Sequence, residues 1–159
     1  MSVLAVIRPD DWNFPLLVHV FGAMVLIGGL VTALAFQLIG WRPQEPAAAA
    51  SLARWSFWSL LFVAFPAWWV MRIGAQWIYS KENWDSVSEE PTWLGIGWIT
   101  SEGGGVFLLV GIILAGVGAR RLGRGGGGSS TLVRISAVLV MIALVAYVIT
   151  TWAMSGKPA

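Results

Sequence analysis

The chain has 159 residues and a net charge of +2, and 57% of its residues are hydrophobic while only 11% are charged. Such a chain has too few polar groups to cover a water-soluble surface, so it indicates an integral membrane protein without room for a separate soluble domain. The absence of cysteine excludes disulfides, thiolate metal sites, iron–sulfur clusters and covalently attached haem.

Four apolar runs follow one another along the chain, at about 14–40, 55–78, 94–118 and 132–154. Each is close to the roughly 20 residues that a helix needs to cross about 30 Å of hydrocarbon. The chain lacks the alternating pattern of a barrel, and a backbone in lipid must satisfy its own hydrogen bonds. The sequence therefore predicts one all-α transmembrane domain over residues 1–159, an integral membrane four-helix bundle.

Basic residues predict the orientation of this bundle. They gather in the loops around 41–54 and 119–131, which the positive-inside rule assigns to the cytoplasm. The second of these loops contains the run GGGGSS, a flexible turn by composition. Both termini and the loop at about 79–93 then lie outside, so we expect a multi-pass protein of the bacterial plasma (inner) membrane. Topology and contact with anionic lipid of the bilayer explain the basic residues, and no nucleic-acid partner is predicted.

Three ionisable residues fall within the predicted helices, at a similar depth near the outer surface: His19, Arg72 and Glu102. Such groups are costly in lipid, tend to face the protein interior and are candidate functional residues. His19 shares its helix face with small residues that allow close packing, so we expect it to point inward. Either the three residues form one site, or Arg72 and Glu102 form an ion pair and His19 bonds to the backbone or a hydroxyl.

Aromatic and hydroxyl groups extend this candidate site. Trp68 and Trp69 belong to an aromatic face of the second helix that leads to Arg72, and such a face either lines a flat ligand or contacts lipid. Tyr147 lies in the outer half of the fourth helix, where it completes the polar group. The candidate cofactor-binding residues are His19, Arg72, Glu102, Trp68, Trp69 and Tyr147.

Three local patterns predict features of individual helices. Pro66 removes a backbone hydrogen bond and is expected to kink the second helix. Three consecutive glycines after Glu102 predict a local break, or a close approach of a neighbouring backbone or ligand. Glycines repeat every seven residues at Gly104, Gly111 and Gly118, and this spacing predicts a packing seam.

The first helix also carries a family resemblance. From His19 the sequence reads HVFGAMVLIGG, which resembles the first helix of small bacterial membrane proteins of the DUF2269 type. Those proteins are similar to the membrane domain of the CopD copper-resistance family and, more distantly, to the HemJ-type protoporphyrinogen oxidases. An apolar–His pair followed by a Gly-Gly pair carries the resemblance, which covers about one helix.

This resemblance implies a bundle of four or more helices with His19 as an axial haem ligand or a metal ligand. It further implies that Arg72 holds a propionate or another anion and that aromatic residues flank a porphyrin. His19 is the only histidine of the chain, so bis-histidine ligation of haem b within one chain is excluded. Copper would depend on methionines, and the candidates are Met24, Met71 and Met154.

Three functions remain open from the sequence. The first is a redox-linked accessory protein that binds haem, a quinone or a metal at the outer-facing polar site. The second is a non-enzymatic subunit or interaction module whose Trp-rich outer loop, residues 79–93, docks a membrane or periplasmic protein. The third is a small transporter, with or without homo-oligomerisation, in which His19 and Glu102 relay protons. No catalytic triad, phosphate loop or metal-ligand spacing is present, and enzymatic activity is left undecided.

Overall fold

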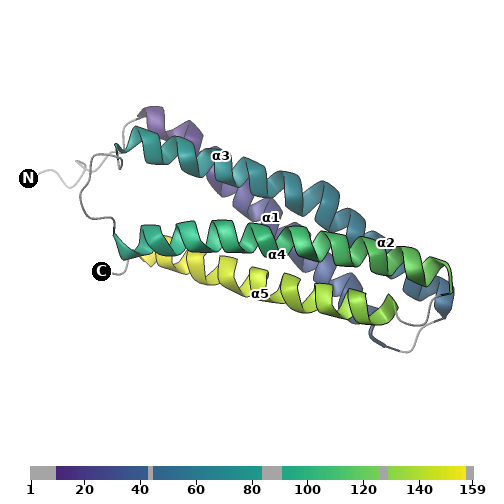
Figure 1. Cartoon of the computed structure of the whole chain (residues 1–159). Helices are drawn as coiled ribbons and strands as arrows, with labels where there is room; N and C mark the ends of the chain where they lie inside the picture. Colours follow the sequence, from purple (N-terminus) through teal and green to yellow (C-terminus); the bar gives the residue numbers. More distant parts are fainter. Residues whose placement is uncertain (1–9, 43–44, 84–90, 126–128, 157–159) are drawn as a thin grey trace, which may run out of the picture.

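The computed structural model describes residues 10–42, 45–83, 91–125 and 129–156, which form four long helical rods (Figure 1). All four rods are long and apolar enough to cross a membrane, which confirms the predicted all-α membrane bundle. After a short 3-10 turn at Asp10–Trp12, the elements are α1 (Asn13–Ile39), α2 (Pro46–Ser59), the π-helical segment η2 (Leu60–Ala64), α3 (Phe65–Lys81), α4 (Thr92–Gly123) and α5 (Ser129–Gly156).

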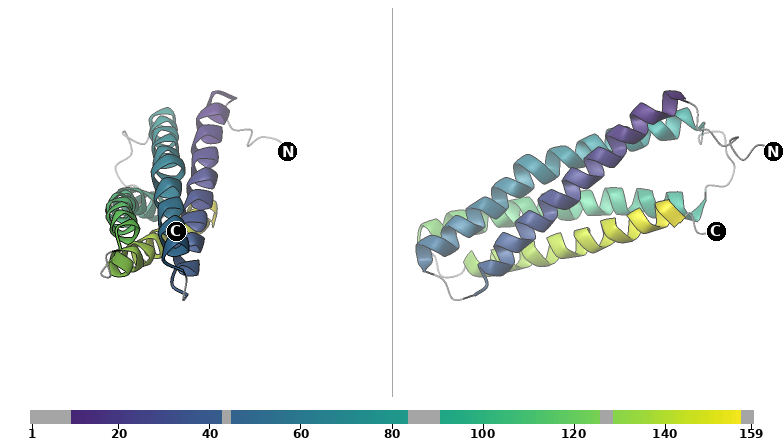
Figure 2. Two further views of the ribbon diagram at one scale, coloured as in Figure 1. Left: turned by 90° about the vertical axis from the view of Figure 1, so that its right-hand side faces the viewer. Right: turned by 180° about the vertical axis from the view of Figure 1, so that it is seen from behind.

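The rods are arranged as two antiparallel pairs, α1 with α3 and α4 with α5. Where α1 ends and α2 begins, α2 packs against both α1 and α4 and brings the pairs together. Toward the other end the two pairs diverge, as the views in Figures 1 and 2 agree. Following the predicted orientation, we call the diverging end, which carries Asp10 and Gly156, the outer end and the opposite end the inner end.

The helices continue further into the polar segments than the apolar runs predict. The second rod begins at Pro46 rather than near residue 55, because proline suits the first turn of a helix and the alanines that follow favour helix. α4 continues through Arg120 and Arg121 to Gly123, and cations in the last turn compensate the helix dipole. Residues 84–90 of the expected outer loop and residues 126–128 of the glycine-rich turn lie outside the described residues.

Pro66 does not interrupt the second rod, which is helical from Pro46 to Lys81. Instead, the turn before it is π-helical, and the N–H of Phe65 donates to the carbonyl oxygen of Leu60. Proline has no N–H and its ring crowds the carbonyl four residues earlier, so a widened turn relieves the clash. The disruption expected at Pro66 is therefore a π-helical segment.

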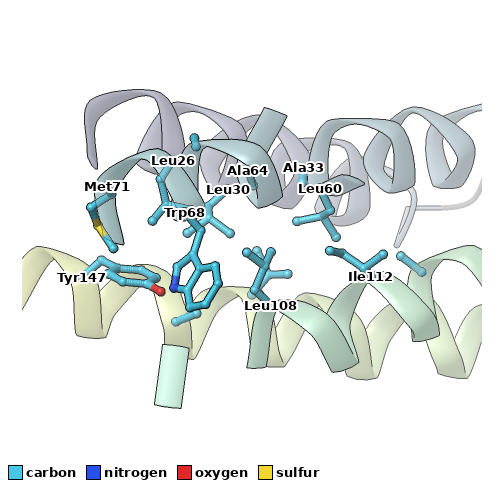
Figure 3. Packing of buried hydrophobic residues seen from close by; sticks show 14 residues of the cluster. Leu26, Leu30, Ala33, Leu60, Ala64, Trp68, Met71, Leu108, Ile112 and Tyr147 are labelled. Carbon is cyan, nitrogen blue, oxygen red and sulfur yellow. The ribbon is translucent and has the colours of Figure 1, made fainter. Parts of the chain in front are cut away.

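Apolar side chains from every rod meet between the two pairs, and Figure 3 shows this core from close by. Leu26, Leu30, Leu60 and Leu108 are fully buried. Many large apolar side chains on the opposite faces of the helices are exposed, as in Met24 at 68%, and these faces suit contact with the lipid bilayer. The buried leucines form a mainly apolar layer between the polar residues of the outer half and those of the inner half. A buried hydroxyl lies beside it, where Ser59 Oγ donates to the Gly29 carbonyl oxygen over 2.9 Å.

Candidate functional site

Arg72 joins the two helix pairs in the outer half of the bundle. Its Nη2 and Nε atoms lie 2.6 Å and 3.0 Å from Oε1 of Glu102 on α4. Its guanidinium carbon also lies 4.2 Å from the ring centre of Trp98, and Trp98 and Glu102 share a face of α4 because they are four residues apart. The structure therefore contains the Arg72–Glu102 ion pair that the sequence left as one of two interpretations.

His19 lies on the other side of α3. Its Nδ1–H donates to the carbonyl oxygen of Met71 over 2.9 Å, since a carbonyl can only accept. The backbone of His19 also faces Gly74, where an added Cβ would lie 2.5 Å from the His19 nitrogen. Gly74 and Arg72 are two residues apart and so point about 200° apart around the helix. The structure thus ties His19 to the α3 backbone, away from the face on which Arg72 meets Glu102.

Trp68 and Tyr147 cover the glycine run of α4. The indole Nε1–H of Trp68 donates to the carbonyl oxygen of Ser101 over 3.1 Å. An added Cβ would lie 2.5 Å from the Tyr147 hydroxyl at Gly104, and 2.6 Å from the Trp68 ring at Gly105. Figure 3 shows the two aromatic side chains side by side, with the tyrosine oxygen directed toward the indole. The close approach predicted here is confirmed, and α4 runs through it without a break.

Two hydroxyl groups in this region are buried without a hydrogen-bond partner in the described part of the chain, Tyr147 Oη and Ser101 Oγ. A buried polar group without a partner costs about 1–3 kcal/mol. By contrast, Thr150 Oγ1 donates to Thr100 Oγ1 over 2.7 Å, one turn further out. The two hydroxyls are therefore the buried polar groups of this site whose hydrogen-bonding capacity the described chain does not use.

The remaining predicted site residues lie at the edge of this region or apart from it. Trp69 is half-exposed and packs edge-on against Trp68, with ring centres 4.8 Å apart, so it faces outward from the bundle. Met24 is exposed on α1, whereas Met71 is buried in the core and Met154 packs against Gly97. Within the described ranges, no three His, Cys, Asp or Glu side chains form a group that could hold a metal ion.

A second buried polar group, in the inner half, was not predicted. The amide Nε2–H of Gln37 donates to Ser136 Oγ over 3.0 Å, and that hydroxyl donates to the carbonyl oxygen of Gly111 over 2.8 Å. The network joins α1, α5 and α4. Its signals in the sequence are Gln37 in the apolar run 14–40 and a lone serine in the run 132–154, and neither shows which helix it meets.

The three consecutive glycines provide a matched test of this packing. An added Cβ at Gly103 meets no atom within 4 Å, so Gly103→Ala should raise the free energy of unfolding by about 1 kcal/mol through helix propensity. Gly104→Ala and Gly105→Ala should lower it by about 1–3 kcal/mol, because Tyr147 or Trp68 must move. Thermal unfolding in detergent, followed by circular dichroism, measures all three, and equal effects at the three positions would contradict the packing.

No family model, curated protein or solved structure matches this chain. The resemblance of residues 19–29 to the DUF2269-type proteins therefore stays a prediction. The function has to be inferred from the chemistry of the site.

Proposed function

We propose that this protein binds a quinone in the outer half of the bundle and is a redox-linked accessory protein of the bacterial plasma membrane. The pair of buried, unpaired hydroxyls on Tyr147 and Ser101 is the observation that supports it. A quinone ring is flat and apolar, and its carbonyl oxygens accept hydrogen bonds. Tyr147 and Ser101 would donate to the carbonyl oxygens, and the indole of Trp68 would provide an aromatic surface.

The proposal includes entry to these groups from the outer end of the bundle. The α1–α3 and α4–α5 pairs diverge toward that end. The Arg72–Glu102 ion pair lies one turn outward from Trp68 and links the two pairs. A headgroup that enters between the pairs would reach Tyr147 after passing this ion pair. Arg72 and Glu102 would therefore govern entry rather than bind the ring.

These residues fit a quinone better than a haem. A haem ligated by His19 of α1, with a propionate on Arg72 of α3, would need these two side chains to meet on the same side of α3. They lie on different sides of that helix, and Arg72 is already bound to Glu102. A quinone requires neither arrangement, because its recognition uses hydroxyl donors and an aromatic surface.

The other two hypotheses have less support. A proton relay from Glu102 to the inner end would have to cross the apolar layer, where Leu30, Leu60 and Leu108 are fully buried. Docking of a protein partner through the outer loop, residues 79–93, stays a prediction, because residues 84–90 of that loop lie outside the described residues.

Tyr147→Phe removes the hydroxyl and keeps the ring, so it tests the proposal directly. The purified protein in lipid nanodiscs is titrated with a short-chain ubiquinone, and quenching of tryptophan fluorescence reports binding close to Trp68. We expect saturable quenching for the wild-type protein. We expect affinity about tenfold weaker for Tyr147→Phe, which corresponds to loss of one buried hydrogen bond.

Two control variants distinguish loss of a hydrogen bond to the quinone from a general effect of removing any hydroxyl group. Tyr79→Phe alters the other tyrosine of the chain, which packs edge-on against Trp98 with ring centres 5.6 Å apart. Ser56→Ala removes a buried hydroxyl in the inner half that also lacks a partner in the described chain. Both should bind quinone like the wild-type protein. Absence of saturable quenching in the wild-type protein, or unchanged affinity in Tyr147→Phe, would refute the quinone site.

A further inference from the structure

The inner end of the bundle contains a partly enclosed cavity of about 50 Å³. Its walls come from α1, α2, α4 and α5 and from Gly40 and Trp41, the two residues that follow the end of α1. Phe36, Leu122 and Val133 make the walls largely apolar, while Gln37 and Arg134 are the polar side chains of the lining. Holding one water molecule takes about 10–15 Å³ of such space, so the cavity accommodates a few groups of hydroxyl size.

Gln37 has an unused acceptor at this cavity. Its Nε2–H is bonded to Ser136, but its Oε1 is buried without a hydrogen-bond partner in the part of the chain that the structure describes. The residue as a whole is only 1% exposed. A buried amide oxygen of this kind requires a donor, and an O–H group placed in the cavity would supply one.

The surface around the cavity is strongly cationic. Six exposed arginines belong to this end, and no ion pair within the described ranges engages them. Glu45 is the one acidic residue between α1 and α2 or between α4 and α5. The arginines are Arg42, Arg54, Arg120, Arg121, Arg124 and Arg134. Guanidinium groups bind phosphate through two parallel hydrogen bonds, so this surface complements an anionic headgroup.

We propose that the cavity is a specific site for an anionic phospholipid whose headgroup carries hydroxyls, of the phosphatidylglycerol class. The phosphate pairs with Arg134 at the mouth of the cavity, and a headgroup hydroxyl enters and donates to Oε1 of Gln37. Trp41, which is 41% exposed, lies beside the cavity at the level that tryptophan prefers at membrane surfaces. This site lies at the opposite end of the bundle from the proposed quinone site and is independent of it.

Native mass spectrometry of the full chain, titrated with defined lipids, tests the proposal. Phosphatidylglycerol should bind about tenfold more tightly than phosphatidylcholine, which carries no net charge. It should also bind several-fold more tightly than phosphatidylethanol, which has the same charge and no headgroup hydroxyl. Equal affinity for phosphatidylglycerol and phosphatidylethanol would overturn the role of Gln37. Displacement of the lipid by inorganic phosphate would overturn the lipid assignment.

Matched variants locate the site on the protein. Arg134→Ala should weaken phosphatidylglycerol binding about tenfold, whereas Arg124→Ala, at the same end but not in the cavity lining, should leave it unchanged. Ala49→Leu fills the cavity from α2 without changing the charge and should also weaken binding. Equal losses in Arg134→Ala and Arg124→Ala would show a general basic surface and contradict a specific site.

Discussion

Gly74→Ala is expected to lower the free energy of unfolding by about 3 kcal/mol, at the upper end of the usual range for overpacking. The new Cβ would lie 2.5 Å from the backbone nitrogen and 2.7 Å from Cα of His19. Backbone atoms cannot rotate away as a side chain does, so α1 and α3 would have to separate. That separation would also stretch the hydrogen bond between His19 Nδ1 and the Met71 carbonyl.

Gly22 provides the reciprocal test on α1. Its added Cβ would meet the backbone of Met71, with Cα at 2.7 Å, so Gly22→Ala should lower stability by a similar amount. Gly28→Ala is the matched control on the same helix, because Gly28 has no atom within 4 Å of an added Cβ. Chemical unfolding in mixed micelles measures all three variants. If Gly74→Ala unfolded like Gly28→Ala, the backbone contact between α1 and α3 would not exist in the membrane-embedded protein.

Loss of the Arg72–Glu102 ion pair should have the second large effect. Glu102→Gln removes the charge and keeps the size, and Arg72→Ala also removes the contact with Trp98. Hydrogen bonds to charged groups contribute about 1.5–3 kcal/mol, so each single variant should lose an amount of that order. Arg72→Ala should lose more than Glu102→Gln because it loses the cation–π contact as well.

A double-mutant cycle measures how far the two residues depend on each other. The double variant should be more stable than the sum of the two single losses predicts, by about 1 kcal/mol, the upper end for a pair with one exposed partner. The ion pair between Lys81 and Asp11 is the control, because both of its side chains are well exposed, at 42% and 56%. In the Arg72–Glu102 pair Glu102 is 61% exposed, and only Arg72, at 20%, is largely buried. The coupling of the control pair should be smaller, within about 0.2–1 kcal/mol. Strictly additive losses at Arg72 and Glu102 would show that the ion pair is not stabilising.

The fold could be predicted from the sequence because lipid leaves few choices. The length of each apolar run and the need to satisfy backbone hydrogen bonds lead to four helices. The first residue of a helix was harder to predict, because Pro46 and the alanines after it are not apolar enough to be distinguished from a loop. The continuity of α4 through Gly103, Gly104 and Gly105 was also hidden, because Trp68 and Tyr147 on other helices fill the space beside them.

The candidate site could be predicted only as a set of residues at one depth. Helical periodicity shows which residues share a face, but it does not show which neighbouring helix that face meets. The sequence therefore predicts that His19 and Arg72 lie at a similar depth, but it does not show that their contacts are on different sides of α3. The link from Gln37 to Ser136 was missed for the same reason, because it depends on α1 meeting α5 in the inner half.

The glycine seam of α4 extends further than the sequence pattern suggested. Gly97 continues the seven-residue spacing outward and is buried against Met154, and Gly104 and Gly111 face Tyr147 and Val140 on the same partner helix. A single residue inserted between two of these glycines would rotate the part of α4 beyond it by about 100° and turn bulky side chains toward α5. An insertion of seven residues would rotate it by only about 20°. The register of these two helices is thus encoded in a spacing, so we expect this segment to tolerate exchange of its lipid-facing residues far better than insertion or deletion of a single residue.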